Sequence, residues 1–202
     1  MDIQAITLRR LDAGDSLGEL TNMLHRAFSR LGAMGLNCTC VDQSADVTRE
    51  RVGSGDCYVA TCNGRLVGTI TLYTHHSTPG LVAEGLWHQR PDVASVHQFA
   101  VAPDFQGAGL GGAMLDCAED WARVRGYEEL ALHTPQRAEH LVRFYAMRGY
   151  RCVATVQLQG KNYRSVVLSK ELGAAQTRFG TYALQALRHR GSHGALAQGR
   201  CA

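Results

Sequence analysis

Hydrophobic and polar positions follow two periods along the chain, and these periods predict its strands and helices. Alternating or β-rich runs bounded by turn residues are typical of strands, whereas apolar positions three and four apart are typical of helices. The expected strands lie at residues 3–11, 57–62, 66–73, 96–101, 130–133, 150–156 and 165–168. The expected helices lie at 17–31, 47–52, 110–124 and 134–148, and a weak amphipathic pattern predicts one more at 179–187.

Turn and cap residues set several of these boundaries. Asp15 or Ser16 can cap the first long helix, which we expect Gly32 to end. Asn63-Gly64, between two β-rich runs, predicts a hairpin. Pro135 is expected in the first turn of its helix, where a residue without an N–H is tolerated. The helix at 110–124 separates an apolar from a charged side: Leu110, Met114, Cys117, Ala118, Trp121 and Val124 against Asp116, Glu119, Asp120 and Arg123.

The residue composition differs between the main part of the chain and its last thirty residues. The chain has 202 residues, 45% of them apolar and 19% charged, which is enough for one domain with a full core. We expect this domain at residues 1–172. Ala, Gly, Arg, His and Gln dominate residues 173–202, which predicts an extension with one short helix and a disordered tail. The net charge of +3 is too small to predict a nucleic-acid partner.

Apolar runs and cysteines exclude further classes of protein. No run approaches the ~18 apolar residues of a membrane span, and no basic, apolar leader opens the chain, so we expect a cytoplasmic protein without a membrane partner. The seven cysteines form no C-x-x-C pair, which favours reduced thiols in the core. Cys38 and Cys40 are the one close pair, and no histidine lies near them. We expect no metal site.

A glycine-rich loop at residues 106–112, Gln-Gly-Ala-Gly-Leu-Gly-Gly, precedes the helix at 110–124 and predicts a phosphate site. Gly107, Gly109 and Gly112 match the dinucleotide pattern G-x-G-x-x-G, and Glu128 or Glu129 follows at the right distance. However, residues 102–106 separate the preceding strand from the first glycine, which disfavours that interpretation. A P-loop is excluded because no Gly-Lys-Ser/Thr follows. A plain chain reversal is the third alternative.

The other pattern in the loop is Gln106-x-x-Gly109-x-Gly111, placed after a strand that ends in Ala-Val-Ala-Pro at 100–103. It resembles the acetyl-CoA loop of the GNAT superfamily of N-acetyltransferases. Residues 97–103, the helix after the glycines and the segment 144–150 stand in that family's order, as do the strands and helices from 3 to 168. The resemblance implies an α/β (α+β) fold, with a mixed, mostly antiparallel central sheet of about six to seven strands flanked by helices.

The resemblance implies acetyl-CoA as cosubstrate. Glycine permits positive φ and close approach of a ligand, and the helix dipole favours a phosphate. The pantetheine would lie along the strand at Phe99 and Val101 like another strand, and an N–H near Val101 would polarise the thioester carbonyl. Backbone N–H groups of the loop would hold the pyrophosphate: those of Gln106, Gly107, Ala108, Gly109, Leu110 and Gly111.

The catalytic assignments also follow from the resemblance, and each has an alternative. Tyr145 matches the tyrosine that protonates the leaving thiolate, but it could instead be a core residue, because it shares a face with Leu141 and Val142. His97 matches a histidine of some amine acetyltransferases and is our best candidate for the base. Alternation places it on one face with Phe99 and Val101. It could instead be a partly buried structural histidine. Glu84 could act directly or through a water, or be a solvated surface residue.

The irregular segment at 75–92 is expected to form part of the acceptor pocket. The candidates for lining it or the pantetheine channel are His75, His76, His88, Trp87 and Phe105. The function we expect is direct transfer of acetyl from acetyl-CoA to a primary amine in a ternary complex, the amine being a small molecule or part of a protein. The alternative is a non-catalytic, regulatory acyl-CoA-binding module. The segment 179–187 is a candidate dimer arm of a homodimer.

Overall fold

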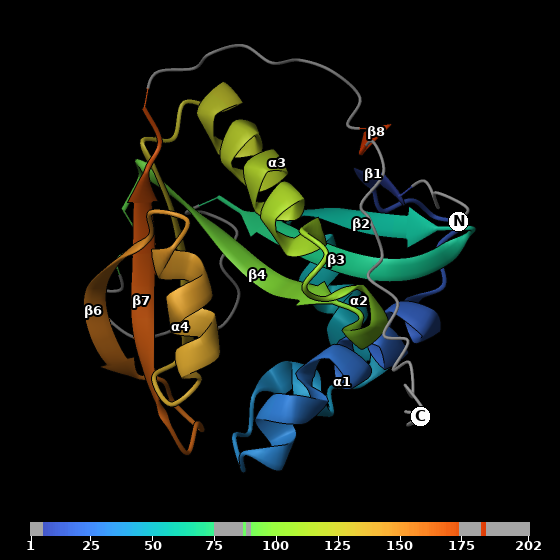
Figure 1. Cartoon of the computed structure of the whole chain (residues 1–202), viewed down its shortest axis with the longest axis horizontal. Helices are drawn as coiled ribbons and strands as arrows, with labels where there is room; N and C mark the ends of the chain where they lie inside the picture. Colours follow the sequence, from blue (N-terminus) through green and yellow to red (C-terminus); the bar gives the residue numbers. More distant parts are fainter. Residues whose placement is uncertain (1–5, 75–86, 88–89, 174–182, 185–202) are drawn as a thin grey trace, which may run out of the picture.

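The computed structural model describes residues 6–74, 87, 90–173 and 183–184. Within this part, one mixed sheet has the strand order β6-β7-β5-β4-β3-β2-β1-β8 (Figure 1). Its strands are β1 (Ile6–Arg10), β2 (Asp56–Cys62), β3 (Arg65–Tyr73), β4 (Val93–Val101), β5 (Glu129–Pro135), β6 (Arg151–Gln157), β7 (Arg164–Glu171) and the two-residue β8 (Ala183–Leu184). Neighbouring strands are antiparallel, except that β4 and β5 are parallel. The mostly antiparallel sheet predicted from the sequence is therefore confirmed, with β8 added at its edge.

Helices pack on both faces of this sheet. The α-helices are α1 (Leu17–Ala33), α2 (Ala45–Gly53), α3 (Leu110–Val124) and α4 (Glu139–Ala146), with short 3-10 helices η1 (Thr39–Val41) and η3 (Pro103–Phe105). On β3, a Cβ added at Gly68 would lie 2.9 Å from Met114 Sδ of α3. Tyr73, five residues later and hence on the other face, donates a hydrogen bond to the Arg51 carbonyl of α2 at 2.5 Å. Thus α3 lies on one face of the sheet, and α1 and α2, which pack against each other, lie on the other.

The parallel strands β4 and β5 separate soon after they begin. Their pairing runs from Val93 opposite Glu129 to Ser95 opposite Ala131. Beyond this point β5 stays paired with β7 as far as Pro135, whereas β4 continues to Val101 beside β3. Figure 1 shows β4 running away from β7 towards the start of α3. Between Ser95 and Val101, no strand of the described part pairs with the β5-side edge of β4.

The structure corrects two predicted helical segments in part. Thr134 and Pro135 belong to β5, where Pro135 lies opposite Ser165 of β7, and the helix begins only at Glu139. Pairing with β7 overrides the preference of proline for a first helical turn, and a strand end tolerates its missing N–H. In the segment expected to be a helix at 179–187, residues 183 and 184 form β8 beside β1. The rest of that segment lies outside the described residues.

The predicted faces of α3 are mostly confirmed, with two exceptions. Val124 is 53% exposed, because the helix ends there. Glu119 is buried, although it stands among the charged positions. Lys170 of β7 donates to both of its carboxylate oxygens at 2.8 Å, and Arg123 donates at 3.2 Å. A buried carboxylate persists when it is paired in this way, and the pairing depends on a strand that is distant in sequence.

Candidate active site

The loop between η3 and α3 has the backbone expected of a phosphate-binding turn. Gly107 and Gly109 have φ of 74° and 89°, in the left-handed region that favours glycine. Gly109 is the N-cap of α3 and provides no side-chain cap, and no acidic residue lies in the first turn. The first helical bond is donated by Ala113 N to Gly109 O at 3.1 Å. The N–H groups of residues 110–112 therefore have no partner within the helix and can bind an anion.

Gln106 is engaged within the turn itself. Its Nε2 donates to the Val101 carbonyl at 2.9 Å, and its backbone N–H donates to the Pro103 carbonyl at 3.2 Å. The side chain therefore ties the loop to the end of β4. Of the six loop residues predicted to bind pyrophosphate through their backbone N–H groups, Gln106 therefore has its N–H occupied by the Pro103 carbonyl.

Phe99 and Val101 present their backbone groups at the open edge of β4. Ala102 N donates to the Val67 carbonyl of β3 at 2.8 Å. Successive residues of a strand direct their backbone groups to opposite sides, so those of Val101 and Phe99 point away from β3. The two residues that we predicted to hold pantetheine thus direct backbone groups to an edge that an extended ligand could pair with, although the Val101 carbonyl already accepts from Gln106 Nε2.

A bulge interrupts β4 just before this edge. Two residues of β4, Gln98 and Phe99, lie opposite the single residue Ile70 of β3. Gln98 has φ of 45°, a left-handed conformation that is rare for a residue with a side chain. An extra residue reverses the alternation of side chains for everything that follows it.

The predicted alignment of His97, Phe99 and Val101 on one face is therefore wrong. Phe99 and Val101 face α3, because a Cβ added at Gly111 would lie 3.5 Å and 3.7 Å from their side chains. His97 faces the α2 side, where its ring lies 4.4 Å from that of Tyr73. The bulge places the candidate base across the strand from the candidate pantetheine contacts.

His97 sits in a buried polar cluster. It is 8% exposed, and its Nε2 lies 3.0 Å from Ser95 Oγ. The ring of His133 on β5 lies 5.9 Å away, across the point where β4 and β5 separate. Burial raises the pKa of the neighbouring Tyr73 to about 12, so this phenol stays neutral at ordinary pH.

Tyr145 occupies the opposite, apolar side. Its ring contacts Phe99, Phe144 and Tyr150, with centroids 6.4, 5.2 and 5.9 Å apart. The residue is 7% exposed, and burial raises the pKa of its phenol far above the ordinary value near 10. The hydroxyl is therefore protonated at all ordinary pH values, as an acid must be before it donates.

Glu84, His75, His76 and His88 lie outside the described residues. Trp87 donates from Nε1 to a Glu129 oxygen at 3.0 Å, at the start of β5. Phe105 packs against the main core.

Cys38 and Cys40 are buried free thiols, and burial raises the pKa of both. No group of three or more His, Cys, Asp and Glu side chains within the described ranges is placed to hold a metal.

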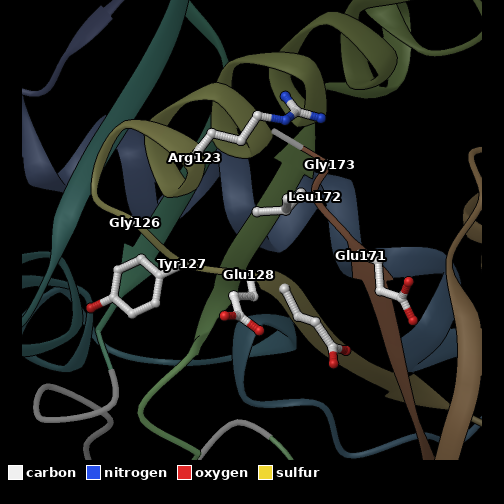
Figure 2. A pocket seen from close by; sticks show the side chains of 8 residues that line it. Arg123, Gly126, Tyr127, Glu128, Glu171, Leu172 and Gly173 are labelled. Carbon is white, nitrogen blue, oxygen red and sulfur yellow. The ribbon is translucent and has the colours of Figure 1, made fainter. Parts of the chain in front are cut away.

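A surface depression of about 530 Å³ lies elsewhere, beside the C-terminal end of α3 (Figure 2). Helix α3 has 15 residues, so this depression is roughly 20 Å from the glycine loop. Its rim carries Glu128, Glu129 and Glu171 with Arg123. An acidic rim repels phosphate, and we exclude this depression as a coenzyme site.

A mixed sheet that opens between two parallel strands, beside a helix start with free N–H groups, is the acyl-CoA N-acyltransferase fold. The sequence matches the Acetyltransferase (GNAT) family over residues 22–150. The chain belongs to this family and is an acetyltransferase, which confirms the resemblance in the sequence. Among the helices of the described part, none is both long and apolar enough to cross a membrane.

Individual relatives agree with this assignment. The chain is 24% identical over 159 residues to an S-(2-succino)cysteine N-acetyltransferase of Bacillus subtilis (strain 168), which covers 76% of this chain and 89% of the relative. A GNAT acetyltransferase of Elizabethkingia anophelis with bound acetyl-CoA superposes with a TM-score of 0.57 at 20% identity, covering 83% and 98% of the two chains. The PaiA N-acetyltransferase of Thermoplasma acidophilum in complex with coenzyme A gives 0.63 at 17% identity, covering 82% and 98%.

Proposed function

We propose that the protein transfers the acetyl group of acetyl-CoA directly to a primary amine within a ternary complex. The observation that carries this proposal is the open edge of β4 at Phe99 and Val101, next to the glycine loop. Pantetheine pairs with that edge as an added strand, and the pyrophosphate lies on N–H groups from Gly107 to Gly111. The thioester then lies beside the bulge, between His97 and Tyr145.

The proposed proton donor and the proposed proton acceptor lie on opposite faces of β4. The neutral amine attacks the thioester carbonyl, the C–S bond breaks, and Tyr145 protonates the departing thiolate. His97, on the α2 side, accepts the proton that the attacking amine loses, with Ser95 holding its ring. Glu84, acting through a water, is the second candidate for this base. The bulge supports direct transfer because it separates the acceptor's side from the side of the leaving thiol.

The acceptor is a primary amine of a small molecule or of a protein. The curated relative is named for acetylation of S-(2-succino)cysteine, an amino-acid amine. Glu84 and Asp92 are the only acidic residues between positions 75 and 95. So few carboxylates disfavour polycations such as polyamines and aminoglycosides.

Two measurements on the full chain test the proposal. Release of free thiol is followed with acetyl-CoA and a panel of amines, amino acids and peptides with free N-termini, while calorimetry measures the Kd for CoA. We expect CoA binding together with amine-dependent thiol release. Binding without release across the panel would favour a regulatory acyl-CoA-binding module instead. Absence of CoA binding would overturn both.

A further inference from the structure

A chain of hydrogen bonds, partly buried at Arg51 and buried beyond it, runs from α2 to the bulge of β4. Arg51 Nη1 donates to Gln43 Oε1 at 2.7 Å, and Gln43 Nε2 donates to Gln98 Oε1 at 2.8 Å. The same Gln43 Nε2 donates to Thr48 Oγ1 at 2.7 Å. Gln43 and Gln98 are only 5% and 4% exposed. Three elements, α2, the segment before it and β4, are thus joined through two side-chain amides.

The direction of this chain is fixed by Arg51. A guanidinium can only donate, so Gln43 must present its oxygen to Arg51 and its NH₂ group to Gln98. Gln98 must in turn present its oxygen to Gln43. Exchanging N and O of Gln98 would set two NH₂ groups against each other. The last donor of the chain, Gln98 Nε2, is consequently aimed away from Gln43.

That last donor has no partner. Gln98 Nε2 is fully buried and makes no hydrogen bond within the described part of the chain. A buried donor without a partner is unfavourable, and native proteins rarely leave one unpaired. The backbone of Gln98 is also in a left-handed conformation that glycine would adopt more easily. Two unfavourable features at one residue, next to His97 and Phe99, are typical of a functional site.

We propose that Gln98 Nε2 binds an oxygen of the acceptor, namely the carboxylate or amide carbonyl attached to the carbon that bears the acetylated amine. This inference rests on the proposed function and specifies the acceptor class. An N–H donor requires an oxygen acceptor, and the cation of Arg51 at the far end polarises both amides towards a negative oxygen. No described carboxylate is hydrogen-bonded to Arg51, Gln43, Thr48 or Gln98 and so able to compete. The carboxylate of a free amino acid and the first carbonyl of a peptide offer this same group.

Matched acceptors test the proposal. Alanine, methionine and phenylalanine are each compared with their amides and with the amines that lack the carboxyl group, using kcat/KM from thiol release. We expect the wild-type enzyme to prefer at least one carbonyl-bearing form over its carbonyl-free partner by tenfold or more. The amides distinguish the two sources: equal rates for amide and acid indicate a peptide carbonyl, and a preference for the acid indicates a free carboxylate. Absence of a preference for the carbonyl-bearing form in all three sets would overturn the proposal.

Variants separate this role from a structural one. Gln98→Leu removes the amide, and Gln98→Gly removes it while relieving the backbone. Both should reduce the preference for carbonyl at least tenfold. Gln98→Glu should penalise acids more than amides, because its second oxygen repels a carboxylate. Gln157→Leu, which removes an exposed amide on β6, is the control and should keep the preference. Retained preference in both Gln98→Leu and Gln98→Gly would refute the proposal.

A binding measurement keeps the inference testable if no acceptor is turned over. Calorimetry then compares N-acetylalanine, N-acetylmethionine and N-acetylphenylalanine with the N-acetylated amines that lack the carboxyl group, each added to the CoA complex. Binding of an N-acetylamino acid that weakens tenfold in Gln98→Leu would support Gln98 even though the proposed turnover had failed. No difference between the two sets of compounds would exclude it. Circular dichroism and the Kd for CoA verify that each variant is folded.

Discussion

Tyr145 combines a large buried ring with a hydroxyl that the packing does not require. Phe99, Phe144 and Tyr150 contact the ring, and within the described residues the hydroxyl makes no hydrogen bond. Replacing tyrosine by phenylalanine at this position therefore keeps the packing and removes only the proton donor. This makes the hydroxyl a residue-scale feature that can be tested almost in isolation.

We expect Tyr145→Phe to lower kcat by about 10²-fold or more, the usual contribution of a general acid, while the Kd for CoA stays within a few-fold. Steady-state thiol release and calorimetry measure the two quantities. Tyr150→Phe is the matched control: it keeps the ring that packs against Tyr145 and removes a buried hydroxyl that donates to Glu119 at 3.4 Å. If kcat of Tyr145→Phe equals that of the wild type, Tyr145 is only a core residue.

Single residues also mark where prediction from sequence fails. The resemblance could assign roles to Tyr145 and the glycine loop because both carry local patterns, and these roles stay predictions. The face of His97 was mispredicted, since the bulge at Gln98 depends on how β3 pairs with β4. Glu119 was placed at the surface because its partner Lys170 lies 51 positions later. One feature of the local sequence pointed to Gln98, namely a polar side chain in an apolar strand. Nothing in the local sequence predicts its hydrogen-bond chain.

At the scale of elements, α3 carries a left-handed glycine at each end. Gly109 begins the helix with φ of 89°, and Gly126 follows it with φ of 80°. The two positions have similar backbone conformations, and only the first lies in the proposed coenzyme loop. The same substitution at both ends therefore separates ligand binding from backbone strain.

We expect Gly109→Glu to weaken CoA binding at least tenfold, because it sets a carboxylate against the pyrophosphate and distorts the loop. Both substitutions should lower the free energy of unfolding by ~1–2 kcal/mol, because both positions have positive φ. Gly126→Glu, however, should leave the Kd for CoA nearly unchanged. Calorimetry and urea unfolding give both quantities for each variant. Equal losses of CoA affinity would show that strain in α3, rather than the loop, controls binding.

Helix boundaries set by cap residues close in sequence were predicted well. The boundary at which strand pairing competes with the helix was predicted poorly. The helix at 110–124 matches α3, and α1 extends two residues past the predicted end. The helix expected from Thr134 fails because β7 pairs with β5 through Pro135. Long-range pairing, which no local period reports, decides that boundary.

At the scale of the molecule, the sheet consists of two parts joined by the short pairing of β4 with β5. Pantetheine lying along β4 would extend the contact between them. We expect CoA to slow hydrogen exchange at the N–H groups of Phe99 and Val101, which face the open edge. Ala102, already bonded to Val67, is the internal control and should change little. Native-state exchange measured by NMR resolves these amides, and unchanged rates at Phe99 and Val101 would contradict pantetheine pairing.

Buried tyrosines make the stability of the whole molecule sensitive to alkali. Burial raises the pKa of Tyr145 and Tyr150 far above the value near 10 that a tyrosine has in the unfolded chain. Below pH 10 both states keep these protons, so the stabilisation is complete. Above pH 10 the unfolded chain releases them while the folded protein does not, so the free energy of unfolding falls as pH rises.

Each such group should contribute a loss of about 1.4 kcal/mol per pH unit above pH 10, until its folded pKa is reached. Urea unfolding of the wild type and Tyr145→Phe at pH 8, 9, 10 and 11 measures the difference. We expect the free energy of unfolding of the two proteins to differ by a constant amount up to about pH 10. Above pH 10 the wild type should lose stability faster than the variant, because the unfolded variant has one fewer phenol to ionise. Buried thiols such as that of Cys57, whose pKa burial also raises, lower the stability of both proteins equally and cancel. Parallel curves up to pH 11 would mean that the Tyr145 phenol ionises as readily in the folded protein as in the unfolded chain, and that solvent reaches it.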